Sequence, residues 1–245
     1  TALVMVQYPD FFGRIYDLSA LAQAVHAAGA LLSVSVNPLA LGLLMPPGEF
    51  GADIVTGEGQ PLGIPLSYGG PYLGIFATRT EYVRKMAGRL VGETIDNRGQ
   101  RAYVLTLTAR EQHIRREKAT SNICTNVALM ALASTLYMSL LGKPGLRQVA
   151  ELCYQKAHYA ANRISELPGF SLWSDAQFFH EFVVRCPKPV SEINEELLEY
   201  GILGGYDLGQ DYPDLKNHML IAVTEMVSKE EIHLLADSLV EVTRG

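Results

Sequence analysis

The sequence predicts an α/β protein whose first strands lie parallel in one sheet. Three observations support this. Residues 2–8 form a largely apolar run, residues 17–28 have a helical pattern that stops at Gly29, and Leu31–Val36 alternates valine and leucine with serine. β-Branched residues favour strands, and glycine commonly ends helices. Strand, helix and strand in this order are typical of parallel neighbours in one layer.

The middle of the chain predicts two more strands and then long helices. Residues 53–56 and 73–78 are short apolar runs, separated by a stretch rich in glycine and proline at residues 57–72. From residue 110 to residue 165, apolar residues recur at helical spacing, with a break at residues 142–145. The apolar run at 126–141 is shorter than the roughly 20 residues of a membrane span, so we expect a buried helix.

The last third of the chain predicts a small α+β domain. We expect strands at 170–173, 181–186 and 218–224, and helices at 190–200 and 228–242. Ser228 and Glu231 have the spacing of a capping box at the start of the last helix. The predicted division is therefore part of a large α/β domain in residues 1–142, and a linking helix with the small domain in residues 143–245. Because the chain opens inside a strand without an initiating methionine, we expect a fragment that lacks an N-terminal part.

Composition excludes several kinds of partner. The net charge is −6, which argues against nucleic acid or an anionic membrane. The three cysteines are far apart and the six histidines are scattered, so we expect reduced thiols, a cytoplasmic location and no metal site. These features leave an enzyme subunit or a binding module.

Residues 51–74 resemble the cofactor segment of fold type I pyridoxal phosphate enzymes. In the catalytic chain of glycine decarboxylase, a strand is followed here by His-Lys and a glycine-rich turn, and that lysine forms the Schiff base. Without gaps, the His-Lys pair falls on Gln60-Pro61, and one residue earlier it falls on Gly59-Gln60. Neither glutamine nor proline can form an imine. The same register puts Val34 at the aspartate that would face the pyridine nitrogen.

A longer string is more specific. REQHIRREKATSNICT at residues 110–125 is similar to a stretch of the P-proteins of the glycine cleavage system, and the segment from Gly204 to Glu225 resembles the tail of their alpha subunits. The resemblance implies a partial fold type I pyridoxal phosphate-dependent transferase-like large domain followed by the small domain. It also implies an alpha subunit (subunit 1) that binds no cofactor or metal itself.

The same resemblance implies partners and a surface that meets them. We expect a beta subunit that carries pyridoxal phosphate, in an α2β2 assembly, and the lipoyl H-protein; glycine would be the substrate of the complex. No catalytic residue is expected in this chain, which alone would be inactive. Residues expected at the interface or the mouth of the partner's active site are His113, Arg115, Arg116, Thr120, Ser121, Asn122, Gly69 and Gly70.

Three alternatives remain open at this point. The basic residues near 115 could be an ordinary solvated helix face, since exposed charge clusters often contribute little. The chain could instead be a separate pyridoxal enzyme that uses an unexpected lysine, with Lys118 in the most suitable setting, or a non-enzymatic regulatory module. An imine absorption band, removed by Lys118→Ala, would favour the separate pyridoxal enzyme. Failure to assemble with a beta subunit would favour the regulatory module.

Overall fold

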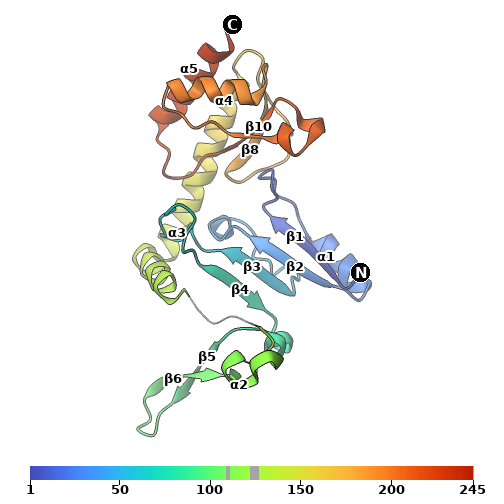
Figure 1. Cartoon of the computed structure of the whole chain (residues 1–245), viewed down its shortest axis with the longest axis vertical. Helices are drawn as coiled ribbons and strands as arrows, with labels where there is room; N and C mark the ends of the chain where they lie inside the picture. The colour runs from blue at the N-terminus through green and yellow to red at the C-terminus, as the bar shows by residue number, and fades with distance from the viewer. Residues whose placement is uncertain (109–110, 122–126, 245) are drawn as a thin grey trace.

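A four-stranded sheet forms the first part of the molecule. The structure, a computed structural model, describes residues 1–108, 111–121 and 127–244. The sheet order is β1 (Leu3–Tyr8), β2 (Leu31–Val36), β3 (Ile54–Glu58) and β4 (Gly74–Thr78), and α1 (Ser19–Ala27) connects β1 to β2 (Figure 1). The first three strands are parallel, which confirms the prediction for them.

The fourth strand differs from the sequence-based prediction. β4 is antiparallel to β3, with Ile54 opposite Thr78 and Glu58 opposite Gly74. A parallel neighbour requires a crossover connection, usually a helix, on one face of the sheet. The segment between β3 and β4 contains no helix and turns back instead, so the strand returns in the opposite direction.

The central strand β2 carries the core of this sheet. Leu32 and Val34 are fully buried, and Ala22 and Val25 of α1 pack in the same cluster. Small and β-branched side chains allow the helix to approach the strand closely. This packing fixes the carboxyl ends of the three parallel strands relative to one another.

A hairpin follows β4 that the sequence reading did not predict. It consists of β5 (Leu90–Ile95) and β6 (Arg101–Thr106), paired from Leu90 opposite Thr106 to Ile95 opposite Arg101. It projects away from the sheet (Figure 1). The turn residues 96–100 (DNRGQ) were the local signal for it, because asparagine, aspartate and glycine favour turns.

The predicted helix from residue 110 is wrong for the described residues before α3. α2 (Gln112–Arg115) has only four residues, and the 3₁₀ turn η4 (Arg116–Lys118) follows it. Arg116 has a φ of 52°, which no residue of a regular right-handed helix adopts. The helical spacing of apolar residues in this segment therefore does not correspond to one continuous helix.

The long helix α3 (Ala128–Ser165) contains the predicted break. Gly142 has non-helical angles (φ 62°, ψ −179°), and Pro144 follows inside the next turn. The second half buries a row of small side chains, among them Ala150 and Cys153. The first half does not: Leu129, Leu132, Leu136 and Leu140 are exposed, Leu140 to 87%.

The prediction of a buried helix at 126–141 is therefore wrong over its described part, residues 128–141. Among the described residues of this half, only Ser134 is fully buried. Burial of a helix depends on what packs against it, and of the described residues 128–141 only Tyr137 belongs to a hydrophobic cluster, which it shares with Leu39 and Leu62. Hydrophobicity alone could not have shown this.

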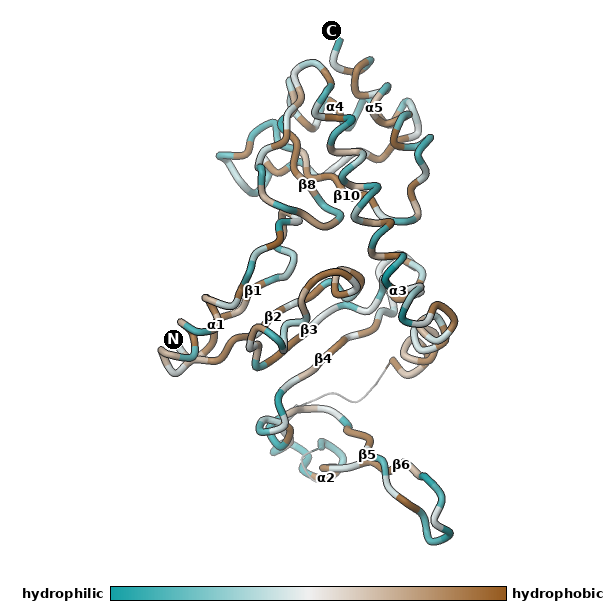
Figure 2. Tube along the Cα trace, turned by 180° about the vertical axis from the view of Figure 1, so that it is seen from behind, coloured by the Kyte–Doolittle hydropathy of each residue, from teal (hydrophilic) through white to brown (hydrophobic). Residues whose placement is uncertain are grey.

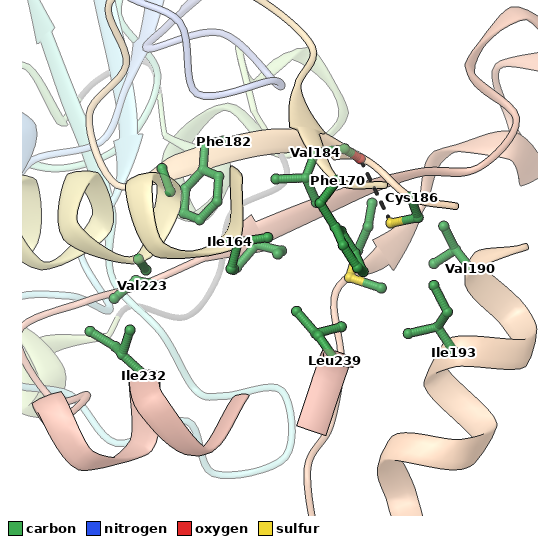
Figure 3. Close-up of a cluster of buried hydrophobic side chains, with 14 of the residues drawn as sticks. Ile164, Phe170, Phe182, Val184, Cys186, Val190, Ile193, Val223, Ile232 and Leu239 are labelled. Atoms are coloured by element: carbon green, nitrogen blue, oxygen red, sulfur yellow. Dashed lines mark hydrogen bonds between the residues drawn. The ribbon is translucent and has the colours of Figure 1, made fainter. Parts of the chain in front are cut away.

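The small domain agrees closely with the prediction. Its sheet consists, in spatial order, of β7 (Ser171–Leu172), β8 (Glu181–Arg185), β10 (His218–Ala222) and β9 (Tyr206–Asp207). The sheet is covered by α4 (Val190–Glu199) and α5 (Lys229–Thr243). The core contains Phe182, Val184, Ile193, Ile232 and Leu239, which point toward one another between the sheet and the helices (Figure 3). Only the two-residue strand β9 was not predicted.

A separate cluster joins the two parts. Leu39, Ala40 and Leu62 of the first part pack with Cys153 and Phe179 of the second. The division at residues 142 and 143 stays a prediction, although the break in α3 falls at that point.

The capping box at the start of α5 gives a first stability prediction. The Ser228 hydroxyl accepts a hydrogen bond from the Glu231 amide at 3.1 Å, and the Glu231 carboxylate accepts one from the Ser228 amide at 2.7 Å. We expect Ser228→Ala to lower the free energy of unfolding by about 1 kcal/mol, because it leaves a helix amide without this acceptor. Urea denaturation measures the change.

Ser191→Ala is the matched control, since Ser191 lies exposed near the start of α4. We expect this control to leave stability unchanged or slightly higher, because alanine is the better helix former. Equal losses in both variants would contradict a specific role of the Ser228 cap.

Candidate functional site: a cleft at the carboxyl ends of the parallel strands

A cleft of about 520 Å³ opens where the three parallel strands end. Ligands of open α/β sheets bind beyond the carboxyl ends of the strands, so this edge is where a site is expected. Its wall combines the segments that follow β1, β2 and β3 with Glu181 at the start of β8. The lining residues are Gln7, Pro9, Ser35, Val36, Asn37, Pro38, Glu58, Gln60, Pro61, Leu66, Tyr72 and Glu181.

Gln60 and Pro61, which occupy the expected Schiff-base position, both line this cleft. The side-chain amide of Gln60 donates a hydrogen bond to the Ile64 carbonyl at 2.6 Å, and its backbone amide donates to the Glu58 carboxylate at 3.0 Å. These bonds hold Gln60 to its own loop. Whichever register is used, no side-chain amine lies at this point of the wall.

Val34, the expected counterpart of the pyridine-facing aspartate, is not among the residues that line the cleft. It lies opposite Val6 and Val55 in the middle of the sheet and is fully buried. Ser35 and Asn37 from the same strand end line the cleft instead. The position that the sequence register matches to the aspartate is therefore a core residue, and the polar groups that this strand contributes to the cleft are those of Ser35 and Asn37.

The polar groups of the wall are neutral or acidic. Among the described residues that line the cleft, none is lysine, arginine or histidine. Glu58 is held in place because its carboxylate accepts hydrogen bonds from the amides of Gln60 and Leu73 at 3.0 and 2.9 Å. Burial, together with the negative charge of the nearby Asp10, raises the pKa of Glu181 to about 6. The cleft therefore disfavours anions, more strongly above about pH 6.

The Gly69-Gly70 turn lies next to this cleft. Both glycines have positive φ values, 111° and 124°, which residues other than glycine rarely adopt. The Tyr72 hydroxyl donates to the Leu66 carbonyl at 2.6 Å and closes the loop that contains the turn. Leu66 and Tyr72 both line the cleft, so the loop forms one side of its mouth.

The other residues expected at the interface lie elsewhere. His113, Arg115, Arg116, Thr120 and Ser121 do not line the cleft. α2 and η4 lie beyond the carboxyl end of β4 in Figure 1. Because β4 is antiparallel to β3, this end lies beside the amino ends of the parallel strands, opposite the cleft. Asn122, together with Arg110 and Cys124 of the signature string, lies outside the described residues.

Sequence reasoning missed two acidic residues of the cleft. Glu58 had a signal, because it stands two residues before Gln60 at the end of a strand. Glu181 had none: it comes from the small domain, more than a hundred residues later, and reaches the cleft only through the packing of β8 on the loop at Gly13.

Other kinds of site were sought in the same residues. Within the ranges that the structure describes, no group of three His, Cys, Asp or Glu side chains could hold a metal ion. No helix in these ranges is long and apolar enough to cross a membrane. Cys153 and Cys186 are free and buried, and burial raises the pKa of each thiol to about 12.

The fold and the position of the cleft define the class of protein. An alanine–glyoxylate aminotransferase from Nostoc sp. has the same fold, with a TM-score of 0.67 over 99% of this chain and 62% of that one, at 18% identity. The chain has the fold of the type I pyridoxal phosphate-dependent transferases. This confirms the predicted fold class.

Closer relatives identify the family. The family model of the glycine cleavage system P-protein matches residues 1–239, and the chain belongs to this family. A probable glycine dehydrogenase (decarboxylating) subunit 1 from Thermomicrobium roseum is 60% identical over 99% of this chain and 54% of the relative. A crystal structure of glycine decarboxylase (P-protein) in inhibitor-bound form has a TM-score of 0.93 at 43% identity, over 99% of this chain and 55% of that one. The chain thus spans about half the length of these relatives.

Proposed function

We propose that this chain is the cofactor-free alpha subunit of a two-subunit glycine decarboxylase, the P-protein of the glycine cleavage system. Its partner, a beta subunit, carries the pyridoxal phosphate, and the two form an α2β2 assembly in the cytoplasm. The complex decarboxylates glycine and passes the aminomethyl group to the lipoyl arm of the H-protein. This chain contributes the interface and shapes the access to the partner's active site.

The wall of the cleft is the observation that carries the proposal. Pyridoxal phosphate requires a lysine amine for its covalent attachment and donors or cations for its phosphate. Gln60 and Pro61 stand where the lysine is expected, and the charged groups of the described wall are the carboxylates of Glu58 and Glu181. Carboxylates repel a phosphate. The residues present therefore do not fit the cofactor.

The remaining site residues belong to the proposed interface. Gly69 and Gly70 form the turn at the mouth of the cleft, and His113, Arg115 and Arg116 lie at the opposite edge of the sheet. We assign both regions to contacts with the beta subunit, together with Thr120, Ser121 and Asn122. In this arrangement one subunit meets its partner on two sides of the same sheet.

Glycine–CO2 exchange tests this function. The assay combines purified beta subunit and H-protein, with and without the full chain. We expect exchange only when the chain is added, because the beta subunit lacks its structural partner without it. The exchange should survive Lys118→Ala, since η4 lies away from the cleft.

The contrary results are equally clear. Loss of exchange in Lys118→Ala, together with loss of an imine absorption band on this chain, would assign it a cofactor of its own. Unchanged activity with no co-elution of the two subunits would contradict membership in the complex and leave only the shared fold.

A further inference from the structure

One face of the β5–β6 hairpin is apolar and open to solvent. The strand pairing puts Val91 opposite Leu105, Glu93 opposite Tyr103, and Ile95 opposite Arg101, and paired residues share a face of the hairpin. All six side chains are exposed. The apolar ones are exposed to 64% for Val91, 69% for Ile95, 62% for Tyr103 and 58% for Leu105. We call these six residues the hairpin face.

The reverse side of the hairpin is less exposed. Four of its six residues are half-buried, whereas Thr94 and Val104 are exposed, Val104 to 46%. The Thr106 hydroxyl donates a hydrogen bond to the Leu90 carbonyl at 3.1 Å. The exposed large apolar side chains of the two strands therefore lie mainly on the hairpin face, with Val104 as the exception on the reverse side. A two-stranded hairpin is only marginally stable in water by itself, so covering the hairpin face would stabilise it.

The segment around the hairpin is basic, although the chain is acidic. Residues 79–118 contain ten of the chain's 20 Lys and Arg residues but only five of its 26 Asp and Glu residues. Arg89, Arg98 and Arg101 belong to the hairpin or border it directly. Figure 2 shows hydrophobic residues along the strands and hydrophilic residues at the turn. An apolar centre with arginine beside it is the usual composition of a protein interface.

We propose that the hairpin face is a further part of the surface on which the beta subunit docks, and that the partner presents an apolar patch bordered by acidic residues. This rests on the proposed function, which supplies the partner. Charge complementarity selects an acidic partner surface. An exposed apolar patch with polar residues at its rim marks an interaction site, and these four side chains would form one part of a larger subunit contact. A membrane surface fits less well, because Glu93 lies in the middle of the face.

Site-specific labelling tests whether a partner covers the face. In Tyr103→Cys, the new thiol should react rapidly with a maleimide in the full chain alone, and at least tenfold more slowly after the beta subunit is added. Leu203→Cys is the control, because Leu203 is exposed in the small domain. Its labelling should be equally fast in both samples.

Affinity provides the second measurement. Leu105→Asp should raise the dissociation constant for the beta subunit at least tenfold, whereas Leu203→Asp should leave it within twofold. Arg98→Glu should weaken binding mainly at low salt, because screening reduces the effect of an exposed charge. Circular dichroism of each variant should match that of the unchanged chain, since all three side chains are exposed.

The outcomes separate this inference from the proposed function. If the unchanged chain does not bind the beta subunit at all, the proposed function fails. If it binds and the hairpin variants bind equally well, only the docking surface is wrong. Slow labelling of Tyr103→Cys in the chain alone would show that other residues of the chain or a second copy cover the face. Protection by vesicles of phosphatidylserine and phosphatidylcholine, but not by the beta subunit, would assign the face to lipid.

Discussion

Asp53→Ala should lower the free energy of unfolding by about 2–3 kcal/mol at pH 7, because it removes the acceptor of a buried network. The Asp53 carboxylate, 3% exposed, accepts a hydrogen bond from the Leu32 amide at 2.8 Å and lies 2.8 Å from His26 Nε2 and 3.2 Å from Arg79 Nε. It thereby ties α1, β2 and the end of β4 to β3. Since His26 and Arg79 are partly exposed and can turn to water, the expected loss is smaller than for a fully buried ion pair.

The pH dependence of this loss follows from the charge. Burial by itself raises the pKa of Asp53, but the Leu32 amide, His26 and Arg79 together outweigh it and hold the pKa below its ordinary value. A carboxyl with a lowered folded-state pKa stabilises the protein above its unfolded pKa of about 3.9 and loses that contribution as the pH falls through the folded value. We therefore expect the difference between unchanged chain and Asp53→Ala to shrink below about pH 4.

Urea denaturation at pH 7 and at several pH values below 4 measures both effects. Asp175→Ala, at an exposed aspartate of the small domain, is the control and should change stability by less than about 0.5 kcal/mol. Asp53→Asn should destabilise the chain at pH 7 without the acid dependence of the native carboxylate. A loss in Asp53→Ala that is the same at all pH values would contradict the role of the charge.

Gly13→Ala should cost about 3 kcal/mol or more, because the two parts of the molecule touch at the Gly13 backbone. A Cβ atom at this position would lie 1.9 Å from the carbonyl oxygen of Glu181, and Gly13 has a φ of 80°. Its carbonyl also accepts a hydrogen bond from the Phe179 amide at 3.0 Å. Alanine would therefore separate the loop from β8, and Glu181 would move out of the cleft with it.

Gly29→Ala is the control that separates the cost of a positive φ from the cost of the steric clash with Glu181. Gly29 has a similar φ of 72°, but no atom lies within 4 Å of the Cβ that alanine would add. We expect a loss of about 1–2 kcal/mol there, due to the left-handed backbone alone. If thermal unfolding shows the same loss for both variants, the approach of Gly13 to Glu181 is not as close in solution as described.

Local patterns predicted most of the secondary structure. The alternation of β2, the helical spacing of α4 and α5, and the Ser228–Glu231 pair all involve residues a few positions apart, and such signals are legible in the sequence. The β5–β6 hairpin was missed although its turn residues are typical, because Gly92, Glu93 and Thr94 interrupt the apolar pattern of β5. The predicted continuous helix at residue 110 was wrong because spacing alone does not exclude a break such as that at Arg116.

The sequence by itself determined the family, through the string at residues 110–125, and it predicts, from the register of the resemblance, that no lysine stands at the Schiff-base position. Both are properties of residues at fixed places in one segment. The tertiary structure alone decided that β4 turns back, that the first half of α3 and the hairpin face are exposed, and that Glu181 joins Glu58 and Gln60 in the cleft. The physical reason is that burial, strand direction and the electrostatics of a cleft depend on groups that come from distant parts of the chain. Their positions are fixed only when the sheet, the long helix and the small domain pack together.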